Sequence, residues 1–547
     1  MALTKVTNSL LDSGALVSKA FGTSSIMIGD DATGTIDAAD YNVGLGVDVF
    51  AALTTGDRNT AIGFASMDAA TTGSDNTAVG NGSLGATTTA SCNVAVGSSA
   101  LTATTTGANN TAVGCDALVA NTTGPSNTAI GLSALAANTV GSSNVALGYQ
   151  SMYTNVQGNR SVAVGYQALY TQNPSSAGDT KNTAVGWGSM ALTTTGTLNT
   201  ALGADSLESN TTASRNTAIG SRVLTANTTG TNNTGVGEYT LAANTTGSYN
   251  TALGTGAMAY YSTTHSNCTA VGRRALHYNT SSNNTAVGTD AMLNATTGGI
   301  NTAVGAEAMR DCTTGAQNVA VGRALWDGVL TGSNNVAVGF DAGQNLTNGE
   351  NNVFIGKDAA RVVNSNNVCI AVGKNATLNN GTTNEFIFGT DVAGVGGNSM
   401  TIGKDNTNRI YNTFTSSATW TRSSDERLKK DIQTNSDLGL DFINDLRTVT
   451  YKWKAPSELA ADMAGYDADK TEADYSSKLY GFIAQEVKQA LDDNNITDFS
   501  GWHVDDTQTD IQGISYEMFV IPLVKAVQEL SAKNDALEAR IATLEGE

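Results

Sequence analysis

The chain has 547 residues, of which only 14% are charged and 59 are glycine, so its composition departs from that of an ordinary globular protein. Its formal net charge of -20 disfavours electrostatic binding to nucleic acid or to an anionic membrane surface. The cysteines are odd in number and lack Cys-x-x-Cys spacing, which predicts reduced thiols with neither a disulfide framework nor a zinc site. They are Cys92, Cys115, Cys268, Cys312 and Cys369.

Residues 1–21 form an aperiodic N-terminal segment with apolar residues at Leu10, Leu11, Leu16 and Val17. The segment lacks the features of a secretory signal, and no stretch of the chain is long and apolar enough for a membrane helix. We therefore expect synthesis and folding in a cytoplasm, without membrane insertion. Because the end of a repetitive β-structure exposes unpaired strand edges, this segment is expected to cap the next domain or to dock it on a larger assembly.

A glycine that ends a short apolar pentad recurs every seventeen residues from Gly29 to Gly165. The series shifts by four residues near Pro174 and continues until it decays at Gly389 and Gly403. Repetition at a fixed period is typical of a solenoid, whose units bury an apolar face only by stacking on their neighbours.

The period is too short for helical pairs, and the Thr, Val, Asn and Gly of each unit favour strands and turns. The sequence therefore predicts a mainly β protein in which residues 22–403 form a parallel β-solenoid or β-roll shaft. About 22 coils stacked ~4.8 Å apart would make a rod of roughly 100 Å.

Two features of the unit leave alternatives open. The Asn that starts each pentad either forms a hydrogen-bonded ladder along the axis or adopts left-handed turn geometry. Bulky residues between the pentads are predicted to mark exposed faces. Three roles would each explain them: binding of a host-surface glycan, filling of a sheet edge, and packing in a trimer. These residues are Tyr149, Tyr153, Tyr166, Tyr170, Trp187, Tyr239, Tyr260, Tyr261, His277, Tyr278 and Trp326.

The unit Asn-Thr-Ala-Val-Gly-x-x-Ala-Leu, as at Asn110, resembles the repeat of the left-handed parallel β-roll heads of trimeric autotransporter adhesins. This resemblance covers residues 22–403. It implies a homotrimer of parallel rolls that pack through their Ala and Val faces, with an interwound triple β-helix as the alternative.

The repeat fades over residues 404–423, which we interpret as a neck. Charged residues and helix formers then become frequent, which marks a small α/β domain over residues 424–517. Within it, residues 449–454 alternate as a strand. Residues 480–487 lead into an amphipathic stretch that carries Val487 and Leu491.

Residues 518–547 predict a trimeric coiled coil, because apolar residues recur at alternating spacings of three and four. Asn534 in this seam would fix the register, and Pro522 is tolerated only in the first turn of the helix. The alternative is a single amphipathic helix on a globular core. The predicted trimerisation residues are Val520, Leu523, Val527, Leu530, Asn534, Leu537, Ile541 and Leu544.

The border between the repeats and the tail carries a second resemblance. The pattern Ser-Asp-x-Arg-Leu-Lys-x-Asp at residues 424–431 and the segment Gly-Phe-Ile-Ala-Gln-Glu-Val at 481–487 resemble the intramolecular chaperone auto-processing domain of bacteriophage tail spikes, tail fibres and endosialidases. The resemblance extends over residues 423–547. It implies a fibre that folds as a homotrimer and then cuts off its chaperone at Ser424.

Hydrolysis at this junction needs an activated nucleophile, and Ser424 with Lys429 could form a serine–lysine dyad if burial in the trimer lowered the pKa of the amine. The resemblance favours the bond between Ser424 and Asp425. Attack by the Ser424 hydroxyl on the preceding carbonyl closes a five-membered ring, however, and favours a cut before Ser424. We expect no cofactor and no metal, and we interpret the acidic residues Asp467, Asp469 and Glu472 as a solvated loop.

Together these features predict a trimeric phage tail fibre of the virion, made in the host cytoplasm, that adheres to the host surface. Its expected partners are two further copies of the chain, a phage tail or baseplate protein at the N-terminus, and a host cell-surface glycan or protein. Its only expected catalysis is a single self-cleavage. The alternatives are an uncleaved structural fibre or adhesin that retains the chaperone as a tip, and a polysaccharide-degrading tail spike.

Overall fold

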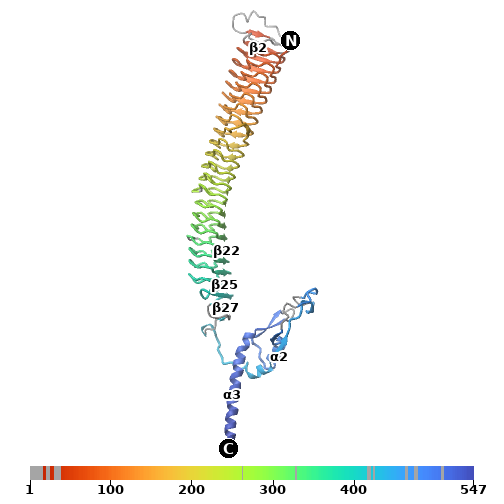
Figure 1. Cartoon of the computed structure of the whole chain (residues 1–547), viewed down its shortest axis with the longest axis vertical. Coiled ribbons are helices and arrows are strands. Elements are labelled where there is room, and N and C mark those ends of the chain that lie inside the picture. The colour runs from red at the N-terminus through yellow and green to blue at the C-terminus, as the bar shows by residue number, and fades with distance from the viewer. Residues whose placement is uncertain are drawn as a thin grey trace, which may run out of the picture. The chain divides into compact units, whose positions relative to one another are not determined.

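The chain divides into two compact units, residues 1–423 and residues 424–547. The first unit is a parallel β-solenoid and the second is a small α/β unit with a long helix, as the sequence predicts (Figure 1). The computed structural model describes residues 17–19, 25–29, 38–261, 263–326, 329–414, 421–422, 426–461, 466–472, 478–506 and 511–546.

The solenoid is a single stack of short strands in which each strand pairs in parallel with the strand of the next coil. The pairing runs without interruption from β2 to β26 and brings equivalent residues of successive repeats into register, such as Ala112 with Ala129. The strands of the stack are β2 (Ile26–Gly29), β3 (Val43–Gly46), β4 (Thr60–Ile62), β5 (Thr77–Val79), β6 (Val94–Val96), β7 (Thr111–Val113), β8 (Thr128–Ile130), β9 (Val145–Leu147), β11 (Val162–Val164), β13 (Thr183–Val185), β14 (Thr200–Leu202), β15 (Thr217–Ile219), β16 (Thr234–Val236), β17 (Thr251–Leu253), β18 (Thr269–Val271), β19 (Thr285–Val287), β20 (Thr302–Val304), β21 (Val319–Val321), β22 (Val336–Val338), β23 (Val353–Ile355), β24 (Ile370–Val372), β25 (Glu385–Gly389) and β26 (Ser399–Gly403). The four-residue insertion near Pro174 adds the separate pair β10 (Gly158–Asn159) and β12 (Gly178–Asp179).

Each coil encloses a thin core of small residues. In the coil of β7, Ala112, Ala117 and Leu118 are completely buried. The backbone hydrogen bonds run between coils: the N–H of Leu118 donates to the carbonyl of Ala134 at 3.0 Å, for example. A coil therefore has no stable structure without its neighbours, which is the physical meaning of the repeat.

The glycine that ends each pentad is required by close stacking. Gly114 has φ +136°, and a Cβ built on it would lie 2.5 Å from the carbonyl oxygen of Gly131 in the next coil. Other left-handed positions are filled by ordinary residues, such as Leu101 with φ 53° and Leu118, the equivalent residue of the next coil, with φ 51°. Complete burial of these leucines offsets the backbone strain of about 1–2 kcal/mol each.

The structure decides between the two roles open to the pentad Asn in favour of the ladder. Both the backbone N–H and the side-chain amide of Asn127 donate to Oδ1 of Asn110, at 2.9 and 3.2 Å. The amide of Asn110 in turn donates to the carbonyl of Gly124 at 3.0 Å. The left-handed residue is the one before the Asn, as at Ser126 with φ 61°. The buried asparagines thus satisfy the polar backbone at the corner of most coils.

Antiparallel strands lie at both ends of the stack. At the N-terminal end β1 (Val17–Lys19) pairs antiparallel with β2, and at the C-terminal end β27 (Arg409–Thr413) pairs antiparallel with β26 and with β28 (Thr421–Arg422). An antiparallel neighbour ends the parallel register and covers an edge that would otherwise pair with another chain.

Two expectations about the solenoid are wrong in part. The pentad alanines are buried inside each coil, so they cannot form a packing face between rolls; only the residues on either side of them point outward. Trp326 and His277 do not mark exposed faces either. Trp326 is completely buried at the position that Leu occupies in other coils, and His277 is buried as well. Side chains alternate between the two faces of a strand, so the sequence shows which residues share a face. It does not show which of the two faces points into the coil.

The second unit has a core of its own around Phe442. Its elements are the 3₁₀ turn η2 (Glu426–Leu428), helix α1 (Leu440–Asp445), strand β29 (Val449–Tyr451), the 3₁₀ turn η3 (Pro456–Glu458), strand β30 (Leu479–Gly481), helix α2 (Ala484–Asp493), strands β31 (Trp502–Asp506) and β32 (Ile511–Ile514), the 3₁₀ turn η4 (Tyr516–Phe519) and helix α3 (Val520–Glu545). Strand β29 pairs with β30 and β31 with β32, both antiparallel.

Candidate processing junction and chaperone unit

The predicted processing site is only partly within the described residues. Ser424 and Asp425 lie outside them, so the proximity of Ser424 to Lys429 stays a prediction. Lys429 follows the turn η2, and its backbone N–H donates to the carbonyl of Glu426 at 3.0 Å. Its side chain is exposed in the single chain.

The amphipathic stretch predicted after residue 480 is helix α2, and it builds the core of the unit. Val487 and Leu491 are buried together with Phe442 of α1. The ring of Phe442 lies 5.8 Å from that of Phe499 and 6.3 Å from that of Phe519, measured between ring centroids. An aromatic cluster of this kind holds α1, α2 and the start of α3 together.

Glu486 gives the segment Gly-Phe-Ile-Ala-Gln-Glu-Val a second anchor. Its carboxylate makes a two-point ion pair with Arg447, which lies just before β29; the Nε to Oε2 distance is 3.0 Å. The hydrogen bond from Arg447 lowers the pKa of Glu486. The pair joins the first turn of α2 to the strand hairpin, although its exposure limits the free energy that it contributes.

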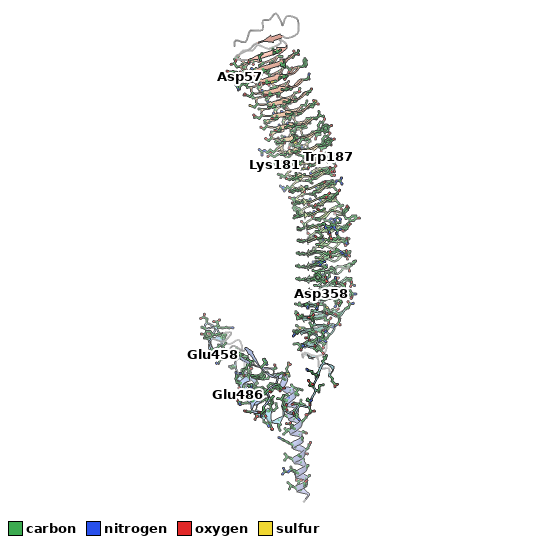
Figure 2. All side chains as sticks on the ribbon, turned by 180° about the vertical axis from the view of Figure 1, so that it is seen from behind. Asp57, Lys181, Trp187, Asp358, Glu458 and Glu486 are labelled. Atoms are coloured by element: carbon green, nitrogen blue, oxygen red, sulfur yellow. The ribbon has the colours of Figure 1, made fainter. Side chains whose placement is uncertain are left out.

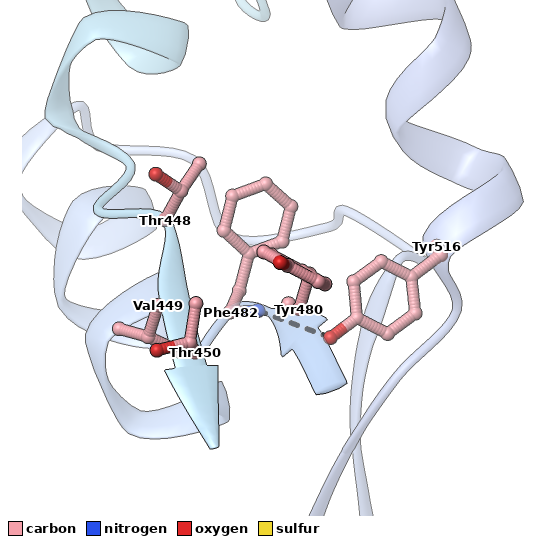
Figure 3. A pocket seen from close by; sticks show the side chains of 7 residues that line it. Thr448, Val449, Thr450, Tyr480, Phe482 and Tyr516 are labelled. Atoms are coloured by element: carbon pink, nitrogen blue, oxygen red, sulfur yellow. Dashed lines mark hydrogen bonds between the residues drawn. The ribbon is translucent and has the colours of Figure 1, made fainter. Parts of the chain in front are cut away.

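Gly481 allows a close approach that the sequence did not indicate. The hydroxyl of Tyr516 accepts a hydrogen bond from the backbone N–H of Phe482 at 3.0 Å (Figure 3). A Cβ on Gly481 would collide with that hydroxyl. The glycine of the segment is therefore needed so that η4 can dock on the end of β30.

The same residues line an open pocket of 540 Å³. Its walls are Thr448, Val449, Thr450, Tyr480, Gly481, Phe482 and Tyr516, drawn in Figure 3. None of these side chains is a carboxylate, amine, imidazole or thiol, and the Tyr516 hydroxyl is already bonded to the backbone. The pocket therefore suits an apolar or aromatic group and offers no acid–base pair for catalysis.

Helix α1 depends on a residue of α3. Its N-cap is Gly439, which has no side chain to cap the helix, and the carboxylate of Glu529 accepts from the N–H of Leu440 at 2.7 Å instead. This hydrogen bond is the main reason why the pKa of Glu529 is lowered, and the nearby Lys525 adds to the effect. A Cβ on Gly439 would overlap the Glu529 carboxylate. The sequence does not indicate this contact, because the position of Glu529 on a heptad helix is the same as that of a solvated Glu.

Helix α3 begins with Pro522 in its first turn, as predicted, and packs Pro522 and Ala526 inward. The seam predicted for trimerisation lies on a different face. Each of its seven apolar residues keeps more than half of its surface exposed in the single chain, and the side-chain amide of Asn534 donates to Glu538 of its own helix at 3.0 Å. The seam is therefore not used by the core of this unit, which argues against the alternative of an amphipathic helix that covers a globular core.

The solenoid carries a ladder of stacked, exposed aromatic rings. Tyr149 and Tyr166 stack at 5.1 Å between centroids, and Tyr166 and Trp187 at 5.8 Å. Trp187, labelled in Figure 2, is 57% exposed. All three follow the pentad glycine of successive coils, so the stacking is a direct result of the repeat.

No helix in the described part of the chain is both long and apolar enough to cross a membrane. Among the same residues, no three His, Cys, Asp or Glu side chains gather as a metal site would require.

Residues 424–496 match the family model described as the chaperone of endosialidase. Neither a curated protein nor a solved structure matches the chain. The family match begins where the second compact unit begins. The chain therefore combines a β-solenoid repeat region with a C-terminal intramolecular chaperone domain of the endosialidase type, and a domain of this family implies trimerisation.

Proposed function

We propose that this protein is a homotrimeric tail fibre of a bacteriophage whose C-terminal domain assembles three chains and then cuts itself off. The observation that carries the proposal is the chaperone-of-endosialidase match at residues 424–496, directly after a β-solenoid. The chain divides into a capping and virion-docking segment (1–21), the shaft (22–403), a neck (404–423), the chaperone (424–517) and a coiled coil (518–547). It is made in the host cytoplasm and resides in the virion.

The exposed seam of α3 supports the assembly step. Leu523, Val527 and Leu530 present apolar surface for which the described residues of the same chain provide no partner. Burial of such residues between three helices would stabilise the trimer by about 1.5–3 kcal/mol per side chain. Three chains held at one end would then fold their coils from that end onward, because each new coil needs a finished neighbour.

The expected cleavage uses Ser424 as nucleophile and Lys429 as base. The Lys429 side chain is exposed in the single chain. A lysine serves as a base only where it is desolvated. Burial of this side chain in the trimer would switch the dyad on, so that cutting follows assembly. Loss of the chaperone would leave the shaft kinetically stable.

The cleavage is tested with two pairs of neighbouring residues. We expect a released C-terminal fragment on denaturing gels for the wild type, for Ser423→Ala and for Lys430→Met. Ser424→Ala and Lys429→Met should give only the full-length chain. N-terminal sequencing of the fragment distinguishes a start at Ser424 from a start at Asp425. A single full-length band in every sample, with a trimeric mass by sedimentation equilibrium, would replace this proposal with the uncleaved fibre.

Adhesion is supported by the aromatic ladder of Tyr149, Tyr166 and Trp187. The rings cover one another's faces, but their exposed edges form an apolar row that suits contact with the rings of a surface polysaccharide. The expected result is that replacement of all three by Ser abolishes retention of the trimer on host capsular or lipopolysaccharide glycans. Replacement of the exposed Tyr41 and Tyr249 should leave it unchanged. Release of oligosaccharides by the wild type would instead favour a polysaccharide-degrading spike.

A further inference from the structure

The outward face of the solenoid sheet has an unusual composition. In each strand the central residue points into the coil and its two neighbours point out, as Thr111 and Val113 do on either side of Ala112. We call the two outward columns from β3 to β24 the outer stripe. Within this stripe the first column contains only Thr, Val or Ile, from Val43 to Ile370, so it carries no charge.

The second column is more restricted still. It contains only aliphatic residues in 20 successive coils: Leu45, Ile62, Val79, Val96, Val113, Ile130, Leu147, Val164, Val185, Leu202, Ile219, Val236, Leu253, Val271, Val287, Val304, Val321, Val338, Ile355 and Val372. None of them is completely buried, and Leu202 is 48% exposed.

Strand propensity does not explain this column. Thr favours strands and is frequent in the first column, yet it never occurs in the second. Leu has no β-branch and occurs there four times. The property shared by all residues of the second column is therefore hydrophobicity. Yet these residues are partly exposed to water in the single chain.

The stripe is large enough for a stable interface. Twenty coils at ~4.8 Å, with two outward residues spanning ~10 Å, give about 1,000 Å² of apolar and hydroxyl surface, more than a monomeric protein ordinarily exposes. The partner must offer apolar side chains with the same axial spacing over the same length. Another copy of this solenoid meets that condition in every coil.

We propose that the outer stripe packs against the outer stripes of two further copies of the chain, parallel and in register, around a common axis. The inference rests on the proposed trimer and assigns its main interface to the sheet face. In this interface the aliphatic residues of the second column, and not the pentad alanines, form the contacts between the rolls. Parallel order agrees with the helix α3, which follows the shaft in every copy and offers its seam to the same two partners.

The test uses two apolar residues of one coil that are equally exposed in the single chain. Ile130 of the stripe is 38% exposed, and Val140, in the turn ten residues further on, is 42% exposed. Each is replaced by Cys in the full-length protein with the exposed thiols removed by Cys92→Ser and Cys115→Ser. The purified proteins are treated with a short bismaleimide and, separately, with a monofunctional maleimide, and their masses are measured by sedimentation equilibrium.

We expect covalent dimers from Ile130→Cys and none from Val140→Cys, because identical residues of the stripe meet only in a parallel, in-register assembly, and we expect a trimeric mass without cross-linker. Maleimide labelling of Ile130→Cys should be at least about tenfold slower than that of Val140→Cys. Trimers in which both thiols react equally and neither cross-links would overturn the stripe as the interface but leave the proposed trimer standing. An antiparallel pairing would place Ile130 opposite a distant coil and would overturn the inference in the same way. A monomeric mass would overturn the trimer itself.

Discussion

The shaft and the C-terminal unit hold their structures in opposite ways. In the shaft most contacts are repeated from coil to coil, so a residue type tends to keep one role: alanine fills the core, glycine permits stacking and asparagine bonds the corner. In the C-terminal unit each contact occurs once, such as Glu529 on α1 or Tyr516 on Phe482. A substitution in the shaft therefore affects the coils stacked on both sides of it. A substitution in the C-terminal unit affects one contact, and the exposed segments around it can adjust.

The two regions also differ in the size of their buried cores and in the apolar surface that they leave exposed. The coils satisfy their own backbone and core within one chain. The C-terminal unit has a small core and a long helix whose apolar seam is open to water. The apolar surface that each region leaves open therefore differs in form, with a flat stripe on the shaft and a helical seam on the C-terminal unit.

The largest effect is expected from the glycine column of the shaft. Gly114→Ala would place a methyl group 2.5 Å from a carbonyl oxygen at a φ that disfavours side chains, with a loss of more than about 3 kcal/mol in the coils around it. Hydrogen exchange should show this loss in neighbouring coils. The control is Gly178→Ala at the insertion, where a Cβ meets nothing within 4 Å, so exchange there should stay unchanged. Equal effects of the two changes would contradict the stacking argument.

Removal of one rung of the asparagine ladder should cost less. Asn110→Ala leaves the buried N–H of Asn127 without its acceptor, for a loss of about 1–3 kcal/mol, whereas the carbonyl of Gly124 keeps the amide of Asn121 as a donor. Limited proteolysis should then cut the shaft near this coil. Asn109→Gly, at the exposed left-handed position one residue earlier, should resist the protease like the wild type.

A smaller effect is expected in the C-terminal unit at Gly481. Gly481→Ala should displace the Tyr516 hydroxyl and destabilise the unit by about 1–2 kcal/mol, while the shaft keeps its stability. Tyr516→Phe removes only the hydrogen bond and should cost about 0.5–1 kcal/mol. Separate denaturant transitions of the two regions would measure both changes. A Gly481→Ala protein as stable as the wild type would show that η4 does not depend on this contact.

The smallest effect concerns pH and Glu529. The folded-state pKa of this carboxylate is lowered from 4.5, so its cap on α1 contributes fully above that value and is lost as the pH falls through the lower folded-state pKa. Protection of the Leu440 amide from hydrogen exchange should decrease in that acidic window. In Glu529→Gln the protection should no longer depend on the ionisation of residue 529. A loss in the variant as steep as in the wild type would rule out this carboxylate as the cause.

Much of the molecule was predictable because its signals are periodic. The recurrence of glycine every seventeen residues predicted the parallel stack, and the alternating spacing after Pro522 predicted a helix that begins near residue 520. The amphipathic pattern at Val487 and Leu491 likewise predicted α2 and its buried face. Such patterns depend only on local geometry, which repeats along the chain.

Contacts between distant residues were not predictable from pattern. Glu529 caps a helix 89 residues earlier in the chain, and nothing in the composition of its surroundings separates it from its solvated neighbours. Trp326 looks like a surface aromatic in sequence but replaces Leu in the core. The Ser424 and Lys429 pair was proposed from a motif and awaits the cleavage test.

The sequence by itself determined the repeat length, the strand at each pentad, the end of the solenoid and the helical seam, since these follow from propensities and spacings along the chain. Only the tertiary structure decided which side of each strand faces inward. Closure of the coil turns the alanines into the core and leaves the aliphatic column before each glycine outside. A strand has two faces of equal period, and the direction in which the backbone turns at its ends selects between them.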